Sequence, residues 1–336
     1  MRQAPRIMSV GVVLASLAAF GWVASGALDA ADTLTQVQWK PFVAAVVLQL
    51  AALMYLMFLW ERLLVKLSGN RPRADKEEKH SLFTAYSRRW LARYIPGRIW
   101  ALGGRMLLAS RVGVPAQEVA RSMAYEVLFS YSIVTIAGAA LLVGARVHLL
   151  LGVGVFLVGM GAFSISVPIM QRLLGRSTPR SEPASWFSKL RSRTQKFIVG
   201  ATYFSGWNTV WAITVYGVYA GFQLLFIVLI AESFVDLTFF QMAVIAGAWG
   251  LSITLGWVSF LAPVGLGVRD GLAFVMFAQV LGVPTASLIV AAARVVLVAA
   301  DLVFVGLVEM LALAMSSRRV RAQAPTQTGN RHLSVP

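Results

Sequence analysis

Long apolar runs constrain the fold of this chain more than any other feature of its sequence. A helix needs about 20 apolar residues to cross about 30 Å of hydrocarbon. The stretch 197–238 is twice that length, with Gly217 and Gly221 near its middle, so we expect two spans there. The expected spans are 7–28, 42–64, 118–143, 148–170, two within 197–238, 239–262 and 284–314. The sequence therefore predicts an all-α integral membrane protein with about eight transmembrane helices.

Composition agrees with this prediction. Only 13% of the residues are charged and 58% are hydrophobic, whereas a soluble domain carries about 25% charged residues. Residues 7–28 follow Arg2 and Arg6 and end in small residues, which is a pattern shared with signal peptides. Because further membrane helices follow, we expect this run to be retained as the first span.

The formal net charge of +16 comes largely from segments that lie between or after the apolar runs. Segments 62–93 and 172–196 are rich in Lys and Arg, and the C-terminal tail carries Arg318, Arg319 and Arg321. Cytoplasmic loops of membrane proteins carry such an excess of basic residues. We therefore expect these segments and both termini in the cytoplasm, with the protein in a cell (inner or plasma) membrane. Since topology accounts for the charge, we expect no nucleic-acid partner.

The same segments divide the chain into four parts. We expect a first membrane half at 1–170, a basic cytoplasmic linker at 171–196, a second membrane half at 197–315 and a disordered cytoplasmic tail at 316–336.

Several kinds of chemistry are disfavoured by the residue inventory. The chain has no cysteine, and His80, His148 and His332 are far apart in the sequence, so we expect no metal site. The glycines at 265, 267 and 271 follow no strand and do not have the spacing of a dinucleotide site. We expect no cofactor, no catalytic residue and no enzymatic activity of the chain itself.

Two segments break the pattern of continuous spans. The first runs from Pro96 through a glycine cluster with Arg98 and Arg105 to Gly113-Val114-Pro115. The second runs from Pro263 through Gly265, Gly267, Arg269 and Asp270 to Gly282-Val283-Pro284. Broken helices within a membrane must be buried in protein or line a wet cavity. We therefore expect re-entrant segments at 94–114 and 263–282, related as an inverted repeat with Pro96 and Pro263 on opposite faces.

Glu126, Arg294 and Asp301 lie well inside apolar helices, where a charge costs several kcal/mol unless it is paired or hydrated. We interpret them as a polar path, with Glu126 and Arg294 as a candidate pair, and Glu126 as a candidate proton carrier. Arg98, Arg105 and Arg269 lie in glycine-rich stretches next to helix starts and would suit a lipid phosphate.

Plainer readings of these residues stay open. The buried charges are equally compatible with a static ion pair, and the three arginines with juxtamembrane residues held by headgroups. The tryptophans, most of them near span ends, are interpreted as interfacial belts.

At these residues the chain resembles the transmembrane region of lysylphosphatidylglycerol synthases, a flippase-like domain. The resemblance rests on Tyr94-Ile-Pro96-Gly97-Arg98-Ile-Trp100, on the segment from Pro263 to Gly271, and on Arg294, and covers about residues 5–315. Asp270 stands where that family usually has Glu, and Val127 stands where many members have Arg. The resemblance implies translocation or handling of a lipid or lipid-linked envelope precursor. The soluble aminoacyl transferase domain of the bifunctional synthases does not follow here, so we expect no lysyl-lipid synthesis.

Two function hypotheses follow from the sequence, and a third is weaker. The first is a flippase-like transporter for membrane lipids that are anionic or bear phosphate, passive or ion-coupled. The alternative is an accessory membrane subunit for a separate glycosyltransferase or lipid-modifying enzyme. An intramembrane enzyme acting on a lipid phosphate would need paired acids or a histidine near the midplane, which the sequence supports poorly.

Overall fold

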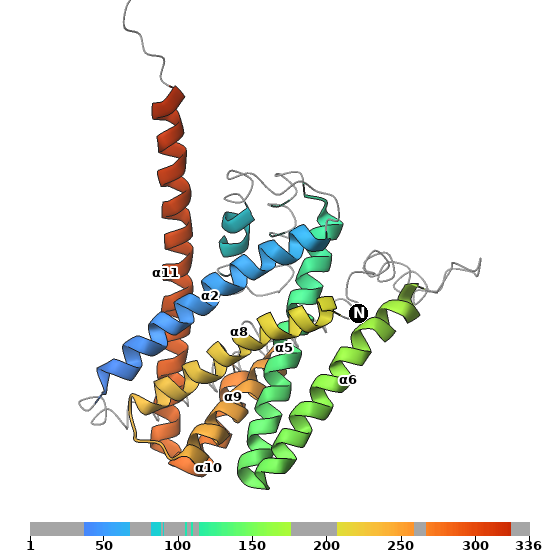
Figure 1. The fold of residues 1–336 in the computed structure, drawn as a ribbon. Coiled ribbons are helices and arrows are strands. Elements are labelled where there is room, and N and C mark those ends of the chain that lie inside the picture. The colour runs from blue at the N-terminus through green and yellow to red at the C-terminus, as the bar shows by residue number, and fades with distance from the viewer. Residues whose placement is uncertain are drawn as a thin grey trace, which may run out of the picture.

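A computed structural model describes residues 37–67, 82–88, 90, 105, 109, 114–175, 207–258 and 267–323. Within these ranges all regular elements are helices, which confirms the all-α prediction (Figure 1). They are α2 (Trp39–Leu67), a short helix over 82–88, α5 (Ala116–Arg146), α6 (Leu149–Gly175), α8 (Trp207–Glu232), α9 (Phe239–Val258), α10 (Val268–Leu281) and α11 (Val283–Gln323). All of these except the short helix and α10 are long and apolar enough to cross a membrane, which makes six candidate spans among the described residues.

The stretch 197–238 does not hold the two spans that its length predicts. Its described part is the single helix α8 followed by a turn that leads into α9. Residues 197–206 lie outside the described ranges and are too few for another span of about 20 residues. Gly217 and Gly221 lie inside α8, because an isolated glycine weakens a helix without having to end it.

Helices α2 and α8 run antiparallel along their length. At the start of α2 the Gln38 backbone N–H donates to Ser233 O just beyond the end of α8, at 2.8 Å. Further along, the Tyr55 hydroxyl donates to Val215 O at 2.9 Å. Near the end of α2, Lys66 Nζ lies 3.5 Å from the ring centroid of Trp211 close to the start of α8.

Close backbone contact holds α5 against α9. A Cβ added at Gly138 would lie 2.8 Å from Gly247 O, and one added at Gly250 would lie 2.8 Å from Val134 O. Small residues that let backbones approach in this way are typical of membrane helix interfaces. A similar contact between Gly144 and Gly152 closes the hairpin of α5 and α6.

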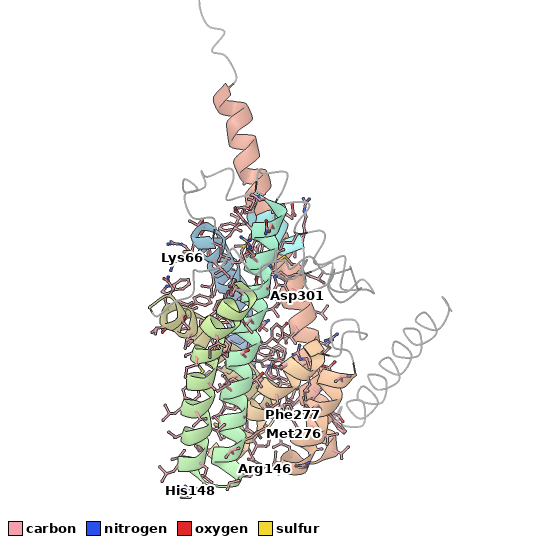
Figure 2. All side chains as sticks on the ribbon, turned by 90° about the vertical axis from the view of Figure 1, so that its right-hand side faces the viewer. Lys66, Arg146, His148, Met276, Phe277 and Asp301 are labelled. Carbon is pink, nitrogen blue, oxygen red and sulfur yellow. The ribbon has the colours of Figure 1, made fainter. Side chains whose placement is uncertain are left out.

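These contacts define two ends of the bundle. We call basic end the one where α2 and α6 end and α5 and α8 begin, because the helices that flank both Lys- and Arg-rich segments meet there. Helix α9 follows α8 through a short turn, so it runs toward the basic end, as α2 does. The turn between α5 and α6, with Arg146 and His148, marks the opposite far end (Figure 2).

Helix α10 packs antiparallel against α9. Gly256 near the end of α9 contacts Arg269, and the Gln241 side chain near its start donates to Val280 O at 3.2 Å, so α10 ends at the far end. There Arg146 donates to Gln279 at 2.8 Å. Residues 259–266 lie outside the described ranges, so the re-entrant segment at 263–282 stays a prediction.

The long helices that follow the two motifs, α5 and α11, start at opposite ends of the bundle, as an inverted repeat requires. The inverted repeat itself stays a prediction, because most of the first motif lies outside the described residues. Of the predicted re-entrant segment 94–114, only residues 105, 109 and 114 are described. Helix α6 continues through 171–175 and α11 through 316–323, so the predicted linker and the predicted disordered tail both begin as helix.

We expect Gly138→Ala to lower the free energy of unfolding by about 1–3 kcal/mol, because the new methyl group would force α5 and α9 apart. The matched control is Gly217→Ala, where no atom lies within 4 Å of the added Cβ. At such a position alanine should be neutral or stabilising by up to about 1 kcal/mol. Unfolding midpoints of the two variants in the same detergent check this, and equal midpoints would contradict close packing of α5 and α9.

Candidate functional site

The interior of the bundle contains charged side chains, although the surface of its spans is largely apolar. Apart from Glu61, the buried charged residues of the described ranges are Arg105, Glu126, Asp270, Arg294 and Asp301. A charge inside a membrane helix costs several kcal/mol unless it is paired or hydrated. Each of these side chains must therefore have an arrangement that offsets this cost.

Arg105 and Glu126 form a direct ion pair. Arg105 Nη1 donates to Glu126 Oε2 at 2.8 Å, and the Tyr86 hydroxyl donates to Glu126 Oε1 at 3.1 Å. Both carboxylate oxygens therefore accept a hydrogen bond.

Two aromatic rings cover the Arg105 guanidinium. Its central carbon lies 3.9 Å from the ring centroid of Trp60 and 4.5 Å from that of Tyr86. The Trp60 Nε1–H donates to the Ser122 hydroxyl at 2.8 Å, one helical turn before Glu126 on α5. The end of α2, the short helix 82–88 and the first turns of α5 therefore meet at one buried cation.

Asp270 and Arg294 make a second, looser pair. Arg294 Nη1 lies 3.7 Å from Asp270 Oδ2, which is too long for a hydrogen bond. The two side chains are 8% and 5% exposed, so neither is solvated by bulk water. Among the described residues Asp270 Oδ2 has no hydrogen-bond partner.

Local backbone geometry brings this second pair together. Gly282, with φ of 82°, turns the chain between α10 and α11 and makes the two helices antiparallel. Gly267, with φ of 86°, precedes α10, and a left-handed conformation of this kind favours glycine. Asp270 in the first turn of α10 therefore meets Arg294 on α11.

Arg269 occupies a different position from its neighbour Asp270. Its guanidinium carbon lies 4.1 Å from the ring centroid of Trp249, and its Cβ would be 2.6 Å from a Cβ added at Gly256. The absence of a side chain at Gly256 therefore lets α10 approach α9 closely. Cation–π contacts of this kind, when desolvated, contribute about 2 kcal/mol.

Helix α11 carries three ionisable residues along one side. Arg294 and Asp301 are two turns apart, and Glu309 lies two turns beyond Asp301. Figure 2 shows Asp301 nearer the level of Lys66 than that of Arg146, and therefore toward the basic end. Glu309 accepts two hydrogen bonds from Arg88, at 2.7 and 3.1 Å, which raise the pKa of the Arg88 guanidinium above its usual value.

The structure describes most, but not all, of the predicted site residues. Arg98, Pro263 and Gly265 lie outside the described residues. The predicted pairing of Glu126 with Arg294 is wrong, because Glu126 pairs with Arg105 and Arg294 with Asp270.

Sequence reasoning also missed two residues of these sites. Trp60 and Trp249 are 0% and 1% exposed and lie against arginines, so they do not belong to an interfacial belt. The position of Trp249 in the middle of an apolar run, rather than at its edge, could have indicated from the sequence that this tryptophan is buried.

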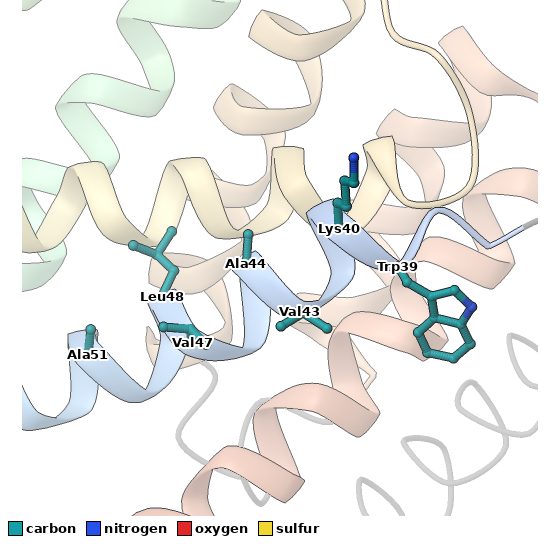
Figure 3. A pocket seen from close by; sticks show the side chains of 7 residues that line it. All are labelled: Trp39, Lys40, Val43, Ala44, Val47, Leu48 and Ala51. Atoms are coloured by element: carbon teal, nitrogen blue, oxygen red, sulfur yellow. The ribbon is translucent and has the colours of Figure 1, made fainter.

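A surface hollow lies away from these charges. It has a volume of about 720 Å³ and follows the first turns of α2 at the far end (Figure 3). Its described lining residues are Trp39, Lys40, Val43, Ala44, Val47, Leu48 and Ala51. None of the buried ion pairs lines it. Within the described ranges, no group of three or more His, Cys, Asp or Glu side chains is placed to hold a metal ion.

Comparison of the chain with protein-family models, with curated proteins and with solved structures finds no match in any of the three.

Removing the charge of Glu126 should unfold the basic end of the bundle. We expect Glu126→Gln to cost about 3–5 kcal/mol, because it leaves the buried Arg105 without its counter-ion. Tyr86→Phe removes one hydrogen bond to the same carboxylate and should cost about 1 kcal/mol.

The control for this pair of variants is Arg88→Gln, which breaks a more exposed ion pair and should cost less than about 1 kcal/mol. Thermal unfolding in detergent ranks the three variants. A Glu126→Gln protein as stable as Arg88→Gln would contradict a buried ion pair at Arg105.

Proposed function

We propose that this protein moves a lipid, or a lipid-linked envelope precursor, with an anionic headgroup between the leaflets of a cell membrane. The observation that carries the proposal is the pair of buried ion pairs inside an apolar helical bundle. Ionisable residues within membrane helices mark the paths of polar substrates more often than they serve packing alone. A headgroup that crosses the bilayer needs such polar groups in its path.

The outer surface of the described bundle favours a lipid substrate. Helix α6 contacts little besides α5, and most of its apolar side chains are exposed, including Leu150, Leu157 and Val158. Such a surface is suited to contact with acyl chains. A substrate that keeps its own acyl chains in the bilayer need only pass its headgroup through the protein.

The resemblance to the transmembrane region of lysylphosphatidylglycerol synthases supports the same class of substrate. Of the residues that carry this resemblance, Gly267, Arg269, Asp270 and Arg294 are described, and Asp270 and Arg294 form the looser ion pair. Lipid translocation is what that family resemblance implies. The lipid itself does not follow from it.

In our proposal the basic end faces the cytoplasm. Both Lys- and Arg-rich segments adjoin helices that meet there, and cytoplasmic loops carry such residues. If residues 7–28 also span the membrane, the order and directions of the helices bring both termini to the cytoplasmic side. This holds whether α9 and α10 each belong to a crossing or together form a hairpin that returns to the far end, because α11 starts at the far end in both cases.

Single cysteines test this orientation cleanly, because the chain has none of its own. In intact cells a membrane-impermeant maleimide should label His148→Cys, at the exposed turn of the far end, and leave Arg62→Cys unlabelled. Both should react after the membrane is permeabilised. Labelling of Arg62→Cys alone in intact cells would reverse the orientation.

Lipid exchange between leaflets tests the function itself. In proteoliposomes we expect the wild-type protein to exchange fluorescent phosphatidylglycerol, and Arg294→Gln to slow this exchange about tenfold or more. The loss corresponds to a charged hydrogen bond of about 1.5–3 kcal/mol. Glu126→Gln is unsuitable here, because it removes the counter-ion of Arg105 and so threatens the fold.

The matched control is Arg88→Gln, the same chemical change at a more exposed ion pair near the basic end, and it should exchange lipid at the wild-type rate. A neutral lipid analogue reports whether the headgroup charge matters. If folded wild-type protein exchanges no lipid, translocation is excluded, and the accessory-subunit alternative is tested by copurification of a glycosyltransferase or lipid-modifying enzyme.

A further inference from the structure

The carboxylates of the two buried ion pairs differ in how well their oxygens are satisfied as hydrogen-bond acceptors. Glu126 accepts two hydrogen bonds at 2.8 and 3.1 Å. Arg294, by contrast, makes no hydrogen bond with the described residues, and Asp270 Oδ2 accepts none. A guanidinium has five N–H donors, and buried polar groups without partners are costly. The pair at Asp270 and Arg294 is therefore incomplete and suited to a further ligand.

The incomplete pair lies deep in the bundle. Arg294 comes 11 residues after the start of α11 at Val283, which corresponds to about 16 Å along the helix. The hydrocarbon core is about 30 Å thick, so this position is near its middle. A group that binds here has left the headgroup region of both leaflets.

Few other charges surround Asp270. Helix α10 packs against α9 and α11. Helix α9 carries no ionisable residue, and on α11 Arg294 is followed by Asp301 two turns later. On α10 itself Arg269 lies against the ring of Trp249. Among the described residues, Asp270 and Arg294 are each other's nearest opposite charge.

Charge balance restricts what this pair can bind. The ionised pair is neutral, and a phosphate group added to it would leave one uncompensated negative charge in a low-dielectric interior. That state is strongly disfavoured. If the phosphate arrives together with a proton on Asp270, the site stays neutral and the guanidinium can turn both of its outer nitrogens toward phosphate oxygens.

We propose that Asp270 and Arg294 form a proton-gated site for a phosphate group, in which a proton on the Asp270 carboxylate releases Arg294 to bind phosphate oxygens. The proton comes from the aqueous phase and binds the Asp270 carboxylate, and no other covalent bond changes. This inference rests on the proposed lipid transport and adds its energy source, since one proton would accompany each phosphate. By linkage, the phosphate raises proton affinity by the same factor as the proton raises phosphate affinity.

In this proposal the residue that binds the proton is Asp270, and not Glu126, which the sequence suggested as a candidate proton carrier. A proton on Glu126 would disrupt its hydrogen bonds with Arg105 and Tyr86 and leave a buried guanidinium unpaired. A proton on Asp270 disrupts no hydrogen bond at Oδ2. Glu126 therefore holds the fold, and Asp270 is the group that can change its charge.

Binding of short-chain fluorescent phosphatidylglycerol to the full chain in zwitterionic nanodiscs tests the site directly. We expect the wild type to bind more tightly at about pH 5 than at about pH 8, by at most about tenfold per pH unit because one proton accompanies each phosphate. Asp270→Asn mimics the protonated carboxylate and should bind tightly at both pH values. Arg294→Gln should bind weakly at both, and Arg294→Lys, which keeps the charge without the paired donors, should be intermediate.

The outcomes separate the inference from the function on which it rests. Asp270→Asn that keeps the wild-type pH dependence overturns the proton gate, even if lipid exchange is observed. Binding that needs Arg294 and follows this pH pattern, in a protein that exchanges no lipid, upholds the site and overturns the transport proposal. Inorganic phosphate added as competitor identifies the ligand source: displacement at millimolar concentration supports free phosphate at the same site, and no displacement supports the lipid headgroup.

Discussion

Neutralisation of charge in a medium without water is the constraint on which the rest of this structure depends. Arg105 is fully buried, and a lone guanidinium in such a place would be intolerable. Its counter-ion, Glu126, belongs to α5. The two rings that cover Arg105 belong to α2 and to the short helix 82–88. These three segments must therefore keep fixed positions relative to one another, and the basic end of the bundle is organised around that requirement.

Helix packing by small residues complements this electrostatic constraint. The glycine contacts between α5 and α9 bring the two backbones together without any polar group, and α9 in turn supports α10 through Gly256. Trp249 on α9 offers its ring to Arg269. The result is close packing of α5, α9 and α10 beside a pair of charges, Asp270 and Arg294, in which Asp270 Oδ2 accepts no hydrogen bond from the described residues. A closely packed frame around such a pair suits a site that binds a ligand.

The contrast between the two ion pairs bears on how the proposed transport works. In one pair both carboxylate oxygens accept hydrogen bonds, whereas in the other the charged atoms are 3.7 Å apart and Asp270 Oδ2 accepts no hydrogen bond from the described residues. Natural proteins leave few buried polar groups unsatisfied, and those that remain tend to have a role beyond folding. In the proposed mechanism the first pair is a fixed structural element and the second is the one that changes partners.

The sequence alone determined that this is a helical membrane protein, and it located every described span except the supposed pair in 197–238, because length and hydropathy are properties of a segment by itself. It also pointed to Glu126, Arg294 and Asp301 as buried charges, since their neighbours along the chain are apolar. Only the tertiary structure decided which charges meet. Arg105 with Glu126, and Asp270 with Arg294, depend on the directions of α2, α5, α10 and α11 and on the turn at Gly282. Hydropathy carries no information about those directions, because an apolar helix is equally apolar whichever way it crosses the bilayer.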